Sequence, residues 1–254
     1  MKPTAELAIV PWTDSRIYNE LGNVESVSDR FSRSAARDEL FRIGTQEIGA
    51  SRVRPYVGVC LLHRHCDLPT SCHMVEREGM FDGRQALLTH PKNRLENSVP
   101  VTWKIVAASA NRLTLLPLEF STTAYAKKLF ARVMDEMSTI RTIAALVSRL
   151  QLTELIGLTI SRTGCLPTPR HDQTILVEST DVETSTNIVR WDREDAFTGR
   201  LLETSWTFGS VTDEDIRQQQ YPKRCPLTCH MLQQCVVYSP GHAIEEKHVS
   251  GHWA

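Results

Sequence analysis

The hydrophobic positions of the chain follow two periods, and each period predicts one kind of element. Apolar residues three and four apart predict helices over residues 35–48 and 124–150, with one break at most in the second. Short apolar runs rich in branched residues predict strands. These strands are expected over residues 56–65, 72–76, 99–106, 112–118, 156–160, 174–178, 187–191 and 202–208. Helices mixed with strands in this order indicate an α+β protein.

The order of these elements repeats along the chain. The first series consists of a helix, a strand containing Gly58, a proline-containing loop and a strand ending at Glu76. The second series has the same order, with Gly157 and Glu178 in the corresponding strands. The two glycines lie 99 positions apart. We therefore predict two helix-strand-strand units, 36–106 and 124–191, that are related by a pseudo-two-fold and form one mixed sheet with packed helices. Chance similarity between amphipathic stretches is the alternative.

Composition shifts divide the chain into three parts. Residues 1–35 are expected to form a polar lead-in, and residues 36–210 a single α+β domain. Residues 211–254 are expected to form a C-terminal segment rich in cysteine and histidine.

The overall composition excludes several classes of function. The 254 residues carry a net charge of -1, so no global field attracts DNA or an anionic membrane. No apolar stretch is long enough for a membrane span. An odd number of cysteines, seven, without an export signal indicates reduced thiols and a cytoplasmic location. No glycine-rich nucleotide-binding motif is present, so we expect no nucleotide cofactor.

Cysteine and histidine are concentrated in two places, and the first is a strand end. His63 and His65 are two apart, so on a strand they point to the same side. The matching positions of the second unit are Arg162 and Gly164, so the scaffold does not require histidines there. The pair could bind a metal ion or act as general acid and base. Histidines that bond to backbone carbonyls are the alternative.

Three carboxylates are further candidates. Glu76 and Glu178 end equivalent strands, and paired carboxylates can divide acid and base roles. We therefore place both with the histidine pair as candidate catalytic residues, with solvated strand ends as the alternative. Glu119 lies between a strand and a helix start, where its charge is predicted to complement the helix dipole.

The second concentration is the C-terminal segment. Cys225, Cys229, His242 and His248 have the spacing C-x3-C-x12-H-x5-H, which falls within the range of two-Cys two-His zinc fingers. The finger also requires apolar residues after the second cysteine, and polar side chains stand at those positions. We therefore reject a DNA-reading finger and predict a structural zinc site of another shape. The additional ligand candidates are Cys235, His230 and His252. A disordered tail is the alternative.

Three segments carry a family resemblance. They are the run from Gly58 to His65, the triplet Met74-Val75-Glu76, and the run from Leu116 to Phe120. Together they resemble a large group of uncharacterised filamentous-fungal proteins with a Leu-His-basic-His segment and a Cys/His-rich C-terminus. The resemblance implies a connection to fungal specialised metabolism, without a defined activity.

These observations lead to one principal hypothesis and two alternatives. The principal hypothesis is an intracellular zinc-binding enzyme, a transferase or synthase, that acts on a small molecule near His63 and His65. The first alternative is an enzyme that makes arginine-containing cyclodipeptides from aminoacyl-tRNA, with tRNA as partner. The second is a non-enzymatic interaction module stabilised by zinc.

Overall fold

The fold is built on one large sheet of mixed strand direction. The computed structural model describes residues 6–48, 50–109, 112–161, 165–167, 174–193, 200–208 and 233–238. Within them the strands are β1 (Glu6–Ile9), β2 (Val57–Leu61), β3 (His73–Phe81), β4 (Arg84–Lys92), β5 (Val99–Ser109), β6 (Arg112–Ser121), β7 (Ile156–Ile160), β8 (Thr174–Asp181), β9 (Thr186–Arg193), β10 (Arg200–Thr207) and β11 (Gln233–Tyr238).

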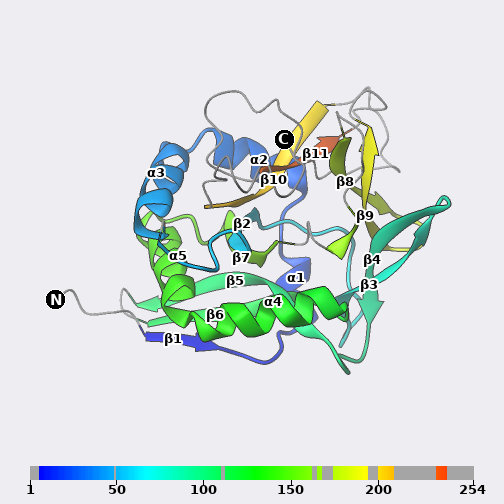
Figure 1. The fold of residues 1–254 in the computed structure, drawn as a ribbon, viewed down its shortest axis with the longest axis horizontal. Coiled ribbons are helices and arrows are strands. Elements are labelled where there is room, and N and C mark those ends of the chain that lie inside the picture. The colour runs from blue at the N-terminus through cyan, green and yellow to red at the C-terminus, as the bar shows by residue number, and fades with distance from the viewer. Residues whose placement is uncertain are drawn as a thin grey trace.

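The strand order makes the sheet curl around an interior. The order is β11-β10-β2-β7-β5-β6-β3-β4-β9-β8, and β1 pairs with β6 outside this path. β8 and β11 stand at the two ends of the order and yet contact each other (Figure 1). Consequently one face of the sheet is turned inward, and its side chains can meet across strands that are distant in the sequence.

Helices cover the outer face of part of the sheet. The helices are α1 (Ser15–Asn19), α2 (Val24–Ser32), α3 (Ala36–Ile48), α4 (Ala124–Asp135) and α5 (Met137–Arg149). α3 packs on α5, while α4 and α5 pack on β5 and β7 (Figure 1). The predicted long helix is therefore two helices. Its single break lies at Glu136, which leaves the helical conformation with φ -114° and ψ 51°.

The central strands are buried on both faces. In β2, Val57, Val59 and Leu61 belong to the apolar core shared with the helices. Gly58 and Cys60 alternate with them and point the other way. A Cβ at Gly58 would lie 1.8 Å from the carbonyl oxygen of Trp206 on β10, so only glycine allows this close approach of the two strands.

The N-terminal segment, expected as a polar lead-in, contributes β1, α1 and α2 to the fold. Val24, Val27 and Phe31 lie on one face of α2 and are buried. Val27 and Phe31 join the helix-covered core, while Tyr18 of α1 joins a smaller cluster on the other side of β2. Most positions of this segment are polar, and the short helices bury only one narrow apolar face, which explains why the sequence pattern is weak there.

The α+β class is confirmed, and the proposed repeat units are neighbours. β2 and β7, the first strands of the two units, pair antiparallel with Val59 opposite Leu158. The helices that precede them, α3 and α5, also pack together. The duplication itself stays a prediction.

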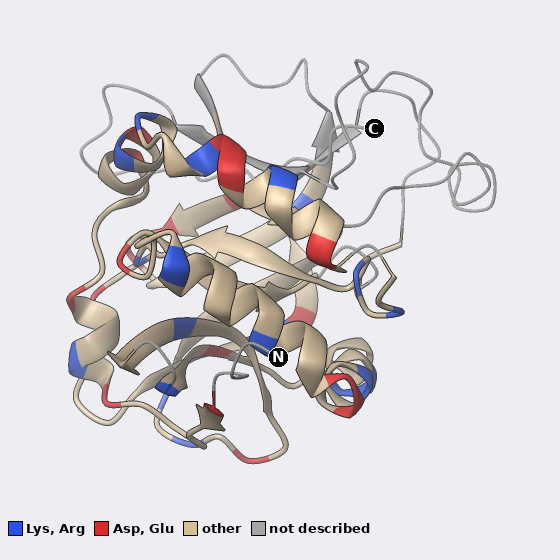
Figure 2. Cartoon of the chain, turned by 90° about the vertical axis from the view of Figure 1, so that its left-hand side faces the viewer, with Lys and Arg blue, Asp and Glu red and all other residues tan. Residues whose placement is uncertain are grey.

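The helix-covered side has no segregation of charge. Figure 2 shows basic and acidic residues interspersed along the helices of this side. Among the described residues, no helix combines the length and apolarity that a membrane span needs.

Candidate metal centre

The inward face of the curled sheet encloses a small polar cavity. Its volume is about 40 Å³, which is room for roughly three water molecules. Thr102 of β5, Glu119 of β6, Thr159 of β7, Glu178 of β8 and Ser205 of β10 contribute to its wall. Alternate residues of a strand face opposite ways, so the period of two brings polar side chains of several strands to the interior. β10 is irregular between Glu203 and Ser205 and contributes Thr204 as well as Ser205.

His63 and His65 line this cavity from the loop that follows β2. The sequence predicts a strand that includes both histidines. In the structure the strand ends at Leu61, and the histidines follow it. His63 forms an isolated parallel bridge with Gly22 instead. The two rings nevertheless come together, with centroids 4.7 Å apart and an interplanar angle of 78°. Both side chains are buried.

The hydrogen bond of His63 fixes its tautomer. Nδ1 lies 3.0 Å from the carbonyl oxygen of Leu61. A carbonyl only accepts, so Nδ1 carries the proton and donates it. In the neutral ring this leaves a lone pair on Nε2. Metal-binding histidines commonly have the same arrangement, in which one nitrogen donates to a carbonyl and the other binds the ion.

The short helix α1 holds the histidine loop in place. The backbone N–H of His65 donates to the Tyr18 hydroxyl oxygen at 3.1 Å. The Asn19 side chain donates to the carbonyl of Leu68 at 3.0 Å and accepts from its N–H at 2.7 Å. The guanidinium of Arg64 donates to the carbonyl of Asn19. The loop conformation therefore depends on a helix that lies more than 40 residues away in the sequence.

Two carboxylates meet the ring of His65. Its Nε2 lies 3.2 Å from Oε1 of Glu119 and 3.4 Å from Oε1 of Glu178. The Glu119 side chain is 7% exposed and that of Glu178 is 9% exposed. Thr102 Oγ1 donates to Glu119 Oε2 at 3.0 Å, and Asn187 Nδ2 donates to Glu178 Oε1 at 2.7 Å. These bonds fix the direction in which each carboxylate points.

The phenol of Tyr18 stays protonated in this environment. Burial raises the pKa of Tyr18 well above its ordinary value, and the negative charge of Glu119 raises it further. Because Tyr18 also lines the cavity, the site combines acidic side chains with a neutral hydroxyl group.

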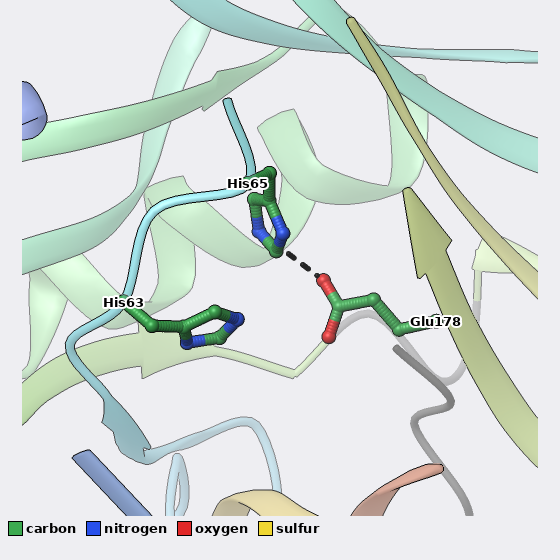
Figure 3. A group of neighbouring side chains, drawn as sticks. All are labelled: His63, His65 and Glu178. Atoms are coloured by element: carbon green, nitrogen blue, oxygen red, sulfur yellow. Dashed lines mark ion pairs between the residues drawn. The ribbon is translucent and has the colours of Figure 1, made fainter. Parts of the chain in front are cut away.

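The residues His63, His65 and Glu178 could hold a metal ion. One ligand atom from each residue lies within 4.8 Å of the other two (Figure 3). The separation of 3.4 Å between His65 Nε2 and Glu178 Oε1 is close to the roughly 3.3 Å that two ligands have in a tetrahedral site with bonds of 2.0–2.1 Å.

The sequence candidates divide into three groups. His63, His65 and Glu178 come together at the cavity, whereas Glu76 is fully buried on β3 and is not among the residues that line it. Cys235 lies on β11, of which only the backbone is described. The remaining tail candidates lie outside the described residues, namely Cys225, Cys229, His230, His242, His248 and His252.

The structure places Glu119 within a strand, whereas the sequence placed it between a strand and a helix start. The N-cap of α4 is Thr123, whose side chain accepts from the N–H of Ala126. Glu119 belongs to β6 and points toward His65. Sequence reasoning also missed Tyr18 and Asn187. Their local sequences carry no sign of the site, because both reach it only through the packing of distant elements.

No family model, curated protein or solved structure matches this chain. The conclusion about the site therefore comes from its geometry: two buried imidazoles and a buried carboxylate converge at the wall of a small interior cavity.

Proposed function

We propose that this protein is an enzyme that uses a metal ion held by His63, His65 and Glu178 to act on a small molecule. The observation that supports it is the convergence of three buried ligand atoms at an interior cavity. Three protein ligands leave a coordination position open, as in catalytic zinc sites, whereas structural zinc sites are closed by four. Zinc is the ion that we propose, since two imidazoles and a carboxylate suit it.

The neighbouring side chains suggest how such an ion would work. A divalent ion polarises a carbonyl oxygen or lowers the pKa of its bound water. Glu119, 3.2 Å from His65 Nε2, lies where a general base could take a proton from that water or from the substrate. The protonated phenol of Tyr18 could donate a hydrogen bond to a developing oxyanion.

The charge of the cavity favours a neutral polar substrate. Two carboxylates balance one divalent ion, and the described lining includes neither Lys nor Arg that would bind an anionic group. Thr102, Thr159 and Ser205 add hydroxyl groups to the wall. A volume of about 40 Å³ accommodates only the reacting group of a substrate. We therefore propose a carbonyl compound without phosphate at its reacting end.

A metal-free acid–base enzyme is the second candidate. The contact of His65 Nε2 with both Glu119 and Glu178 favours it, because two carboxylates stabilise a protonated imidazole. In that case His65 would carry the proton that the reaction moves. The alternatives that involve tRNA or a non-enzymatic module stay predictions, as does the structural zinc of the tail.

Cobalt substitution separates these candidates without knowledge of the substrate. Chelator-treated protein is titrated with Co²⁺, whose visible absorption is strong in four- or five-coordinate sites, and acetohydroxamate is then added. We expect a spectrum that requires His63 and shifts with hydroxamate because a coordination position is open. His63→Ala should lose the spectrum, and His73→Ala, a half-buried histidine of β3, is the matched control.

Three results would contradict parts of this proposal. No spectrum in the wild type would overturn the metal and leave the acid–base enzyme. A spectrum that hydroxamate does not change would indicate a closed, structural site. A spectrum that His63→Ala retains would place the ion elsewhere, for example in the C-terminal segment.

A further inference from the structure

A row of polar side chains crosses five strands beside the metal centre. Glu76 of β3 stands opposite Ser121 of β6 and opposite Thr89 of β4. Thr89 in turn stands opposite Asn187 of β9, which stands opposite Thr180 of β8. Directly opposite residues share a face of the sheet, so all five point the same way. Because Asn187 contacts Glu178, that face is the inward one.

This row is fully enclosed. Ser121, Glu76, Thr89 and Asn187 are all 0% exposed. Burying polar groups costs free energy unless they find partners. Within the described parts of the chain, however, the Thr89 hydroxyl and the side-chain carbonyl oxygen of Asn187 have no hydrogen-bond partner. These two unpartnered atoms at the centre of the row therefore indicate a binding site.

The orientation of Asn187 determines what kind of ligand fits. The Nδ2 group of Asn187 donates to the Glu178 carboxylate at 2.7 Å. Because a carboxylate only accepts, the amide nitrogen must face it, and Oδ1 is the atom turned away from Glu178. Thr89 separates Glu76 from Asn187, and opposite residues have Cβ atoms about 4.5–5.5 Å apart. The oxygens of Glu76 and Asn187 can therefore both approach the Thr89 hydroxyl from its two sides.

We propose that Glu76, Thr89 and Asn187 bind a monovalent cation, Na⁺ or K⁺. The donors are a carboxylate, a hydroxyl and an amide carbonyl, and such all-oxygen sets suit hard cations instead of zinc. The donor set includes one carboxylate, and monovalent cations carry a single positive charge. The site is distinct from the metal centre, whose ligands include two imidazoles.

The test measures ion-specific stabilisation in the presence of a chelator, which keeps the metal centre out of the result. The Tm of the full chain is recorded while NaCl or KCl replaces choline chloride at constant ionic strength. An ion at ten times its Kd should raise the Tm by about 3–6 °C. We expect this gain with Na⁺ or K⁺ and no gain with choline.

Matched variants localise the effect. Thr89→Val keeps the shape and removes the hydroxyl, and it should lose the ion-specific gain. Thr13→Val is the control, because the Thr13 hydroxyl is also buried without a described partner but does not belong to the row. It should retain the gain. Glu76→Gln, which removes the charge, should also lose it.

A second measurement needs no variant. Broadening of the ²³Na resonance by the wild-type protein, reversed by excess K⁺ or Na⁺ but not by choline, would support the site. Equal responses to all three salts, or an ion-specific gain that Thr89→Val retains, would overturn the proposal, and water would then be the partner of the row.

Discussion

Replacing Glu178 with Gln tests the metal centre most directly. Gln keeps the size of the side chain, and its carbonyl oxygen can still accept from Asn187 Nδ2. What it removes is the negative charge 3.4 Å from His65 Nε2 and the anionic ligand. The change therefore acts on metal binding with little change in packing.

The size of the effect follows from ligand chemistry and mass action. Loss of outer partners of a metal site costs 10–100-fold in affinity, so the loss of a direct ligand should cost about 100-fold or more. With free metal at 100 times the wild-type Kd, binding stabilises the wild-type fold by about 2.7 kcal/mol. In Glu178→Gln the same metal concentration would equal the Kd and stabilise by only about 0.4 kcal/mol. The metal-induced rise in Tm should fall from about 5–11 °C to about 1–2 °C.

The assay compares Tm values with and without Zn²⁺ after removal of bound metal. Glu136→Gln is the control, since Glu136 also accepts a hydrogen bond, from Ser51 at 2.9 Å, but lies at the break between α4 and α5 and does not line the cavity. It should show the full rise. If Glu178→Gln kept the full rise as well, Glu178 would not be a ligand and the geometric argument would be refuted.

Three further predictions concern Tyr18, Gly58 and His90. Tyr18→Phe should cost about 1 kcal/mol of unfolding free energy in a urea titration, because the His65 N–H loses its acceptor. The raised pKa of Tyr18 means that its neutral form contributes stability fully below the ordinary pKa of about 10, and less as the pH rises above it. Absorbance at 295 nm should show at least one more tyrosine titrating on unfolding than in the folded wild type. Gly58→Ala should cost about 1–3 kcal/mol or more, since the new Cβ meets the Trp206 carbonyl, and an unchanged urea midpoint would contradict that packing. Burial and neighbouring cations lower the pKa of His90. The neutral His90 ring therefore contributes fully to the stability of the fold above about pH 6.5, and this contribution is lost as the pH falls. His90→Gln should flatten the decline of Tm between about pH 6.5 and 5, and an unchanged pH profile would speak against this source of acid sensitivity.

Much of the local structure could be read from the sequence. The period of the apolar residues predicted α3 over 35–48, and the observed helix is Ala36–Ile48. The prediction of one long helix with a single break matches α4 and α5. Such elements are predictable because each buries a stripe or a face whose period is fixed by the backbone. The N-terminal helices were missed because a five- or nine-residue helix with a polar majority carries too little of that period.

The site was only partly predictable for the same reason. His63 and His65 are close in the sequence, so their spacing brought them to attention together, although they lie in a loop that α1 fixes and not on a strand. Glu119 looked like a helix-capping residue, because it precedes α4 by only a few positions. Whether a strand residue faces the helices or the interior depends on how the sheet curls, which the local sequence does not contain.

Glu76 and Glu178 show what the sequence determines and what only the tertiary structure decides. Both follow a valine, and the sequence by itself determined that each belongs to a strand. It did not distinguish their roles and left open whether they are solvated. Strand order decided them: β8 brings Glu178 to His65, while β3 places Glu76 between β6 and β4 in the polar row. The period of two fixes which residues share a face, but the pairing of strands is set by packing across the whole domain. Only the tertiary structure therefore joins residues from positions 18 to 187 into one site.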